Sequence, residues 1–322
     1  MESPQWNTEG LRWCGSIYAP PKEYSVLSWD ATAPLLYTGN SHPEDNGPGS
    51  IEVWNAEDVS FVKEFHKEQE GIFRMTLSPD GKKMAIVTEK GLQIRYVTSK
   101  RPLWRLPIFA EGLAWSPDSK ILAVCCDELP GALGLFKART GKVIHKPELD
   151  VGGIHHPNPA WHPSGKIVFF TDGGYINRLD VESGEITRLF ENEDTKNITE
   201  LAWFPLQEAL LTNRLSQGFF RVWEPVKETI LHTNTQHDRQ ITGLSCSGDG
   251  RLCATKSWDQ SIRLWDCRTL EEVARLPHEC QSYCSGALAF HPNLPYLATS
   301  DEDSTRIHIW MYDCKILLQE KG

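Results

Sequence analysis

Histidines in two parts of the sequence are the residues best suited to chemistry. His237 and Asp259 could act as a general acid–base pair, because an imidazole beside a carboxylate is the usual arrangement for proton transfer. His155, His156 and His162 could instead ligate a metal ion. His155 and His156 are adjacent, however, so on a strand their side chains would point to opposite faces. His162 lies at a Pro- and Ser-containing turn, where a histidine needs no ligand.

Other motifs for chemistry are absent from the sequence. None of the nine cysteines forms a Cys-x-x-Cys pair, and Cys280 with Cys284 has no matching second pair, which disfavours a zinc site. Asp150–Gly153 and Asp172–Gly174 are glycine-containing turns without the Gly-x-Gly-x-x-Gly spacing of a dinucleotide site. There is no Gly-x-Ser-x-Gly elbow. We therefore predict no catalytic residues, no metal and no cofactor.

Composition and charge narrow the class of protein. The chain has 322 residues and a formal net charge of −10, which disfavours nonspecific attraction to nucleic acid or to an anionic membrane. Its polar N-terminus lacks a secretory signal, and its apolar runs are far shorter than the ~20 residues that span a bilayer. An odd number of cysteines, several within apolar runs, fits reduced thiols. We expect a cytoplasmic protein with no membrane contact, with the nucleus as the alternative location.

Seven copies of one pattern must position these residues. In each copy an apolar run ends at a turn, and the first turn residues are separated by 48, 38, 46, 42, 43 and 44 positions. A period of about 40–45 residues with four short strands per copy is typical of β-propeller blades. We predict an all-β, seven-bladed propeller of four-stranded antiparallel blades. The residues taken as equivalent are Asp30, Ser78, Ser116, His162, Phe204, Ser247 and His291.

The predicted blades cover residues 25–322, after an N-terminal segment at residues 1–24. Leu11–Tyr18 in that segment reads as a strand that could close the ring, since closure removes exposed sheet edges. Lys315–Leu318 also reads as a strand and could fill the same place in the last blade. We favour closure by the N-terminal strand. The blades are expected at about residues 25–65, 73–106, 112–147, 159–190, 199–232, 241–276 and 286–318.

The sixth blade resembles the WD40-repeat family. It contains His237-Asp238-Arg239-Gln240-Ile241, then Ser257-Trp258-Asp259, then Ile262-Arg263-Leu264-Trp265-Asp266. The resemblance implies a buried polar chain that links an aspartate, a histidine, a serine or threonine and a tryptophan. Buried polar groups are tolerated when they are hydrogen-bonded, so such a chain fixes one geometry. The implied positions are Asp259, His237, Thr255 and Trp265 in the sixth blade, and His278, Thr299, Asp303 and Trp310 in the seventh.

The remaining blades match this pattern only partly. Trp54 in the first blade keeps the tryptophan, and the fifth blade keeps Thr212 and Trp223. The first blade has an insertion, Ser41–Gly49, where the aspartate turn is expected. The second, third and fourth blades are expected to have Tyr96, Phe136 and Leu179 in place of the tryptophan.

The resemblance also implies that a partner binds to the loop face around the central channel. An aromatic residue such as Trp258 in a polar turn is a typical interface anchor, as is arginine. The predicted partner-binding residues are Trp258, Arg239, Lys256, Glu302, Tyr283, Arg214, Tyr175 and His42, and the same face would include Glu89, Lys90, Asp127, Glu128 and Asp172. The Ser41–Gly49 insertion is a second candidate surface.

We therefore predict a non-catalytic scaffold that presents a rigid loop face to a protein or peptide, as a subunit of a larger complex. Two alternatives remain open. An enzyme or metal site in the propeller funnel would need several titratable side chains that converge there. A nucleic-acid or chromatin reader would need a basic stripe, which the acidic composition disfavours.

Overall fold

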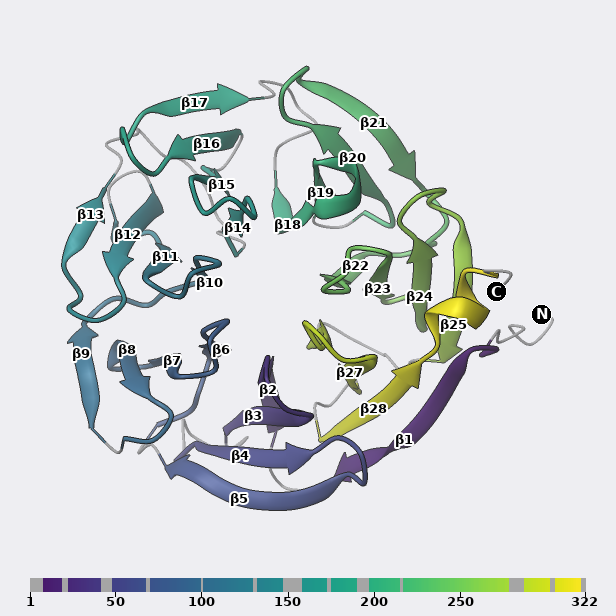
Figure 1. The fold of residues 1–322 in the computed structure, drawn as a ribbon, viewed down its shortest axis with the longest axis horizontal. Coiled ribbons are helices and arrows are strands. Elements are labelled where there is room, and N and C mark those ends of the chain that lie inside the picture. Colours follow the sequence, from purple (N-terminus) through teal and green to yellow (C-terminus); the bar gives the residue numbers. More distant parts are fainter. Residues whose placement is uncertain are drawn as a thin grey trace.

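The structure is a computed structural model in which seven four-stranded sheets stand around a central axis (Figure 1). It describes residues 8–18, 23–41, 48–67, 70–99, 101–129, 132–146, 158–172, 175–189, 197–214, 217–277, 287–301 and 305–319. Within each sheet every neighbouring pair of described strands is antiparallel. The predicted fold class, an all-β propeller with seven blades, is confirmed.

Each of the first four blades is a meander that runs from the inner strand to the outer strand. Blade 1 contains β2 (Glu23–Trp29), β3 (Leu35–Ser41), β4 (Ser50–Asn55) and β5 (Ser60–Lys67). Blade 2 contains β6 (Arg74–Leu77), β7 (Lys83–Thr88), β8 (Gly91–Tyr96) and β9 (Pro102–Leu106). Blade 3 contains β10 (Gly112–Trp115), β11 (Ile121–Cys125), β12 (Leu133–Lys137) and β13 (Val143–His145). Blade 4 contains β14 (Ala160–Trp161), β15 (Ile167–Thr171), β16 (Ile176–Asp180) and β17 (Ile186–Leu189).

The fifth and sixth blades follow the same plan, and the seventh departs from it. Blade 5 contains β18 (Ile198–Phe204), β19 (Ala209–Arg214), β20 (Phe220–Glu224) and β21 (Thr229–Asn234), with a short 3-10 turn at Pro205–Gln207. Blade 6 contains β22 (Ile241–Cys246), β23 (Leu252–Ser257), β24 (Ser261–Asp266) and β25 (Glu272–Pro277). Blade 7 contains β26 (Leu288–Phe290), β27 (Tyr296–Ser300) and β28 (Arg306–Tyr312), and its outer strand is β1 (Leu11–Tyr18).

The first strand of the chain therefore closes the ring. β1 pairs antiparallel with β28, from Leu11 opposite Tyr312 to Tyr18 opposite Arg306. The expectation that Lys315–Leu318 forms a strand is wrong, because β1 occupies that place and the segment forms the short helix α1 (Cys314–Leu317). The carboxylate of Asp313 starts this helix by accepting from the backbone N–H groups of Lys315 (2.9 Å) and Ile316 (3.4 Å).

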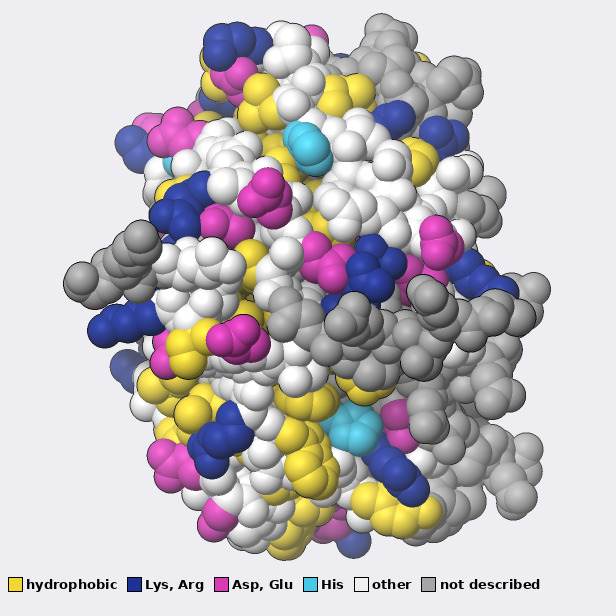
Figure 2. All heavy atoms as spheres, turned by 90° about the vertical axis from the view of Figure 1, so that its right-hand side faces the viewer, with side chains coloured by type: hydrophobic (Ala, Val, Ile, Leu, Met, Phe, Trp, Pro, Cys, Tyr) yellow, Lys and Arg dark blue, Asp and Glu magenta, His cyan; other side chains and the backbone are white. Residues whose placement is uncertain are grey.

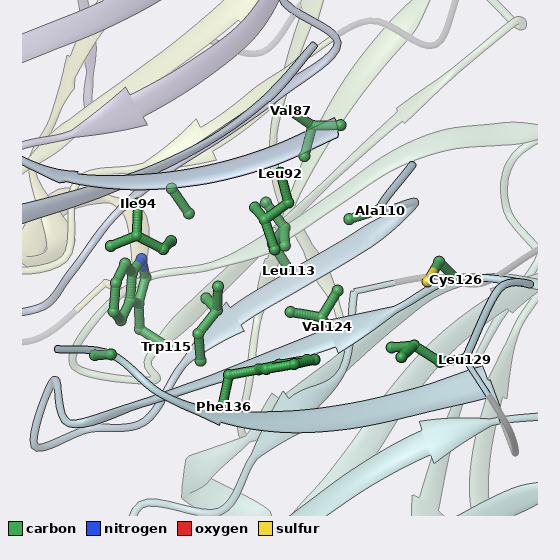
Figure 3. Packing of buried hydrophobic residues seen from close by; sticks show 13 residues of the cluster. Val87, Leu92, Ile94, Ala110, Leu113, Trp115, Val124, Cys126, Leu129 and Phe136 are labelled. Carbon is green, nitrogen blue, oxygen red and sulfur yellow. The ribbon is translucent and has the colours of Figure 1, made fainter. Parts of the chain in front are cut away.

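Apolar side chains fill the space between neighbouring blades. The cluster between blades 2 and 3 shows the arrangement, with Val87, Leu92 and Ile94 from blade 2 facing Leu113, Val124 and Phe136 from blade 3 (Figure 3). These side chains alternate along their strands, so one face of each strand packs on one neighbour and the other face packs on the next. The hydrophobic core is thus divided into clusters that lie between neighbouring blades.

Tryptophans on inner strands join successive blades. The indole N–H of Trp115 donates to the carbonyl of Thr76 in blade 2 (3.2 Å), and that of Trp161 donates to Ala114 in blade 3 (3.1 Å). Between the first and last blades, the indole N–H of Trp29 in blade 1 donates to the carbonyl of Ala289 in blade 7 (2.9 Å). Each bond satisfies the donor of a buried tryptophan and links two inner strands. The ring is therefore a rigid support for the loops at its ends.

Strand register corrects one expectation about blade 2. Trp265 of β24 lies opposite Cys253 of β23, and the equivalent pair in blade 2 is Arg95 opposite Met84. Arg95, which is 1% exposed, occupies the tryptophan position in place of the expected Tyr96. Phe136 opposite Leu122 and Leu179 opposite Val168 occupy it in blades 3 and 4, as expected.

One side of the outer rim is seen in Figure 2, which looks at the right-hand side of Figure 1. Lysine and arginine side chains are interspersed there with aspartate and glutamate, and the described residues in this view form no patch of a single sign. No helix among the described residues is long and apolar enough to cross a membrane.

Candidate functional site

The loops that join an outer strand to the next inner strand share one end of the ring with the turns between second and third strands. We call this end the top face. In blade 6 the loop at residues 235–240 and the turn at residues 258–260 are held together, because the N–H of Trp258 donates to the carbonyl of Gln240 (3.0 Å). The hydroxyl of Ser257 also donates to the carbonyl of Arg239 (2.9 Å). The backbone of this part of the top face is therefore fixed.

Four side chains of blade 6 form a hydrogen-bonded chain beneath that loop. Nδ1 of His237 lies 2.7 Å from Oδ2 of Asp259, and Nε2 lies 2.7 Å from the hydroxyl of Thr255. The indole N–H of Trp265 donates to the same hydroxyl oxygen at 2.9 Å. The structure thus brings together the four residues that the resemblance implied for this blade.

The chain continues into a group of charged residues that the sequence did not predict. Arg263 donates to Oδ2 of Asp259 (3.1 Å) and to Oε2 of Glu272 (3.2 Å). Arg275 binds the Glu272 carboxylate through two nitrogens, each at 2.8 Å. Such bidentate pairs fix geometry as well as charge. The carboxylates of Asp259 and Glu272 are thus each paired with an arginine.

Electrostatics support a neutral His237 beside an ionised Asp259. Burial lowers the pKa of His237, although the hydrogen bond to Asp259 opposes this. Burial would raise the pKa of Asp259, but the hydrogen bond from His237 and the charge of Arg263 together hold it far below its usual range. Nδ1–H then donates to Asp259 while Nε2 accepts from Thr255. The imidazole has 0% exposure, so this pair is not accessible to a substrate.

The other blades keep only parts of the chain. Trp223 donates to Thr212 at 2.7 Å in blade 5, and Trp54 donates to Thr38 at 3.2 Å in blade 1. In blade 7 Thr299 is buried, but the indole nitrogen of Trp310 has no hydrogen-bond partner in the part of the chain that the structure describes. His278 and Asp303 lie outside the described residues.

The predicted partner-binding residues differ in accessibility. Arg239 is exposed, whereas Trp258 and Arg214 are half-buried. Tyr175 is also half-buried, and the Arg188 guanidinium lies 4.6 Å from the centre of its ring. Three further residues predicted for this face, His42, Tyr283 and Glu302, lie outside the described residues.

The expectation that Lys256 is available to a partner is wrong. Its side chain alternates with that of Thr255 along β23 and therefore points to the other face, toward blade 7. There its ammonium group donates to the carbonyl of Ser300 at 2.6 Å, and the residue is 1% exposed. Lys256 links two blades.

The histidine group considered for a metal site is only partly described. His162 bonds to the hydroxyl of Ser164 at 2.8 Å, and its ring packs on Trp203 at 4.6 Å. His155 and His156 lie outside the described residues. Across the described ranges, no three His, Cys, Asp or Glu side chains gather in a way that could hold a metal ion.

Among the described residues of the top face, Phe109 is an exposed aromatic residue that the sequence reading missed. Phe109, in the loop between β9 and β10, is 42% exposed, and its ring meets that of Phe73 at 5.3 Å and 66°. The sequence does carry a sign of this residue, because Phe109 is an apolar residue in a loop between an outer strand and the next inner strand. Such loops are normally polar, so an aromatic residue there indicates a contact surface.

Comparison with known proteins agrees with this geometry. The ring of seven four-stranded sheets defines the chain as a seven-bladed β-propeller. Residues 228–266 match the family model "WD domain, G-beta repeat", which covers blade 6 from its preceding outer strand to Asp266. The resemblance of blade 6 to the WD40-repeat family is thereby confirmed.

Several curated proteins are similar to parts of this chain. "APC/C activator protein CDC20" of Saccharomyces cerevisiae is 26% identical over 203 residues, which are 62% of this chain and 31% of that protein. "Eukaryotic translation initiation factor 3 subunit I" of Anopheles gambiae is 32% identical over 105 residues, 32% of this chain and 31% of that protein. "COMPASS component SWD3" of S. cerevisiae is 26% identical over 104 residues, 32% of each chain. This chain matches about a third of the length of these relatives.

Proposed function

We propose that this protein is a non-catalytic interaction scaffold whose top face binds a protein or peptide partner, as one subunit of a larger complex. The observation that carries this proposal is the contrast within blade 6. His237 and Asp259, the residues best suited to chemistry, have buried side chains in a hydrogen-bonded chain, while Arg239, two residues after His237 in the same loop, is exposed. The blade uses its reactive groups for structure and presents its loop to solvent.

Rigidity supports the proposal. Bonds between inner strands, such as Trp115 to Thr76, and the Ser257–Arg239 contact fix the loops before any partner arrives. A preformed surface loses little conformational entropy on binding. The relatives point the same way, since their names describe an APC/C activator and a COMPASS component. We propose a cytoplasmic or nuclear location for the complex.

The test is affinity capture from native extract with three full-length baits that melt at the same temperature. The first bait is the unchanged protein, and the second carries Arg239→Glu on the top face. The third carries Arg139→Glu, which reverses an equally exposed charge in the turn between β12 and β13 at the opposite end of the ring. We expect a specific protein to be lost only from the Arg239→Glu bait. Recovery of the same proteins by all three baits would reject the Arg239 region as the binding face.

A further inference from the structure

A second part of the top face, over blades 2 and 3, has a chemistry of its own. Phe109 and Phe73 form an edge-to-face pair there, and Phe109 presents 42% of its surface to solvent. The pair stands beside Ala110, which begins the apolar cluster between the two blades. Figure 3 shows Ala110, Cys126 and Leu129 together at one end of that cluster, with Trp115 at the other. Phe109 is therefore next in the chain to a buried residue at that end of the cluster.

Polar contacts hold the loop of Phe109 in place. Its backbone N–H donates to Oε1 of Glu128 at 3.2 Å. Arg74 donates from Nε to the carbonyl of Glu111 (3.0 Å) and from Nη1 to the carbonyl of Phe73 (3.1 Å). The guanidinium of Arg74 thus joins the two loops that hold the aromatic rings. The exposed ring is consequently fixed by neighbours on both sides, which lowers the entropy lost on binding.

Carboxylates are frequent in the top-face loops and turns near the aromatic pair. The segments 70–74, 89–91, 106–111 and 126–129 contain five acidic and two basic residues, a formal net charge of −3. Of the two cations, Lys90 forms an ion pair with Glu70, and Arg74 contacts the carbonyls named above. Glu89, Asp127 and Glu128 are exposed. We call Phe73, Phe109, Glu89, Asp127 and Glu128 the acidic aromatic patch.

The negative charge and the aromatic surface of this patch indicate what kind of ligand it binds. Negative potential repels phosphate groups, which argues against nucleic acid and anionic lipid. The same potential attracts lysine and arginine, while a desolvated aromatic surface gains most from an apolar side chain. We propose that the acidic aromatic patch binds a basic segment of a partner protein, with one apolar side chain packed on Phe109 and flanking cations near Glu89, Asp127 and Glu128. This inference rests on the proposed top-face function and adds the chemistry of the partner.

The test begins with a phage-displayed library of random 12-residue peptides selected against the full-length protein. The patch predicts a consensus with lysine or arginine on either side of an apolar residue. Affinity of a synthetic consensus peptide is then measured by fluorescence anisotropy against the unchanged protein and two variants. Phe109→Ser should weaken binding about tenfold or more. The combined change Glu89→Gln, Asp127→Asn and Glu128→Gln should weaken it by a similar factor, because the attraction for the basic side chains is lost. The loop of Phe109 should stay in place, because Gln at 128 keeps the oxygen that accepts from its backbone N–H.

A matched variant controls for net charge. Glu182→Gln, Glu185→Gln and Glu271→Gln together remove three exposed carboxylates from turns at the opposite end of the ring, and this variant should bind the consensus peptide as the unchanged protein does. Affinity should also fall as NaCl rises from about 0.05 to about 0.5 M, because exposed charges are screened. Equal loss in both triple variants would overturn the proposal, as would a consensus without basic residues.

A further variant separates this inference from the general proposal. If peptide binding is lost in Arg239→Glu but kept in Phe109→Ser, the top face binds partners near blade 6 and the acidic aromatic patch is rejected. If the selected peptides bind all of these variants equally, both proposals fail. Loss in Phe109→Ser with retention in Arg239→Glu supports the patch.

Discussion

The indole N–H of Trp265 donates to the hydroxyl of Thr255 at 2.9 Å, and that hydroxyl lies 2.7 Å from Nε2 of His237. The ionised carboxylate of Asp259 can only accept, so Nδ1 of His237 donates to it. In the neutral imidazole Nε2 is then an acceptor, and the hydroxyl of Thr255 donates to it. The carboxylate thus sets the direction of the hydrogen bonds in the chain. The arrangement is structural, and it ties the second and third strands of blade 6 to the loop before them.

Asp259→Ala should destabilise the protein by about 2–4 kcal/mol. The change leaves His237 and Arg263 buried without the carboxylate that both contact. Chemical denaturation measures the free energy of unfolding. Asp238→Ala, at an exposed position in the same loop, serves as the control and should change stability by less than about 0.5 kcal/mol. Similar values for the two variants would contradict the assignment of Asp259 to the buried chain.

His237 and His291 should each contribute a loss of stability as the pH drops from 7 to 5. Burial lowers the pKa of His237 and of His291 in the folded protein, so the unfolded chain takes up protons first, starting near its own value of about 6.5. The lowered pKa of Asp259 affects stability only at lower pH, since the stability that it contributes is lost below about pH 4.

The variant His237→Gln should show a smaller loss of unfolding free energy between pH 7 and pH 5 than the unchanged protein. His291 remains in the variant and accounts for part of the loss that is left. Denaturant titrations at the two pH values measure the difference. An unchanged pH dependence in the variant would show that His237 does not titrate as described.

Ring closure by β1 makes Ile17 a core residue. It is 1% exposed and packs in the cluster that contains Trp29 and Ile309. Ile17→Ala should therefore cost about 2–5 kcal/mol. Tyr18→Ala, on the next residue, removes a ring that is 55% exposed and contacts Arg306, and it should cost no more than about 1 kcal/mol. If thermal denaturation gives Ile17→Ala the smaller effect, β1 does not close the ring in this register.

Glu200 on β18 should oppose folding at neutral and higher pH. Burial raises its pKa to about 7, although the charge of Arg74 opposes the shift. The folded protein therefore holds this proton more tightly than the unfolded chain, and stability is lost as the pH rises from about 4 through 7. Glu200→Gln should melt at a higher temperature than the unchanged protein at pH 8, with a difference that shrinks toward pH 4. Glu185→Gln is the exposed control, and identical behaviour of the two variants would reject the prediction.

The blades could be predicted because each repeats the same sequence pattern of short strands and turns. Turn residues such as Ser247 and Asp249 bond to one another locally, so their spacing alone locates the ends of strands. The blade 6 chain could be placed by resemblance for the same reason, since its four residues stand at fixed offsets within one copy.

Features that depend on contacts between blades were not predictable. Lys256 is polar and lies near a turn, yet its ammonium group reaches a carbonyl of the next blade. Lys315–Leu318 has strand-forming residues, but β1, from the other end of the chain, already holds the edge of β28. Arg95 takes the place of the expected Tyr96 because the turn between β7 and β8 is one residue shorter than the turn between β23 and β24. The sequence does not show that Phe109 packs against Phe73 of the neighbouring loop, and this contact is what indicates a surface patch there.

The central claim is that the top face binds the partner. The most direct measurement is amide hydrogen exchange of the full-length protein, alone and in the complex recovered by affinity capture. We predict slower exchange in the complex at residues 107–111, 235–240 and 258–260, which belong to top-face loops and turns. Residues 247–250 and 291–295, at the opposite end of the ring, should exchange as before. Protection confined to those two turns would contradict the claim.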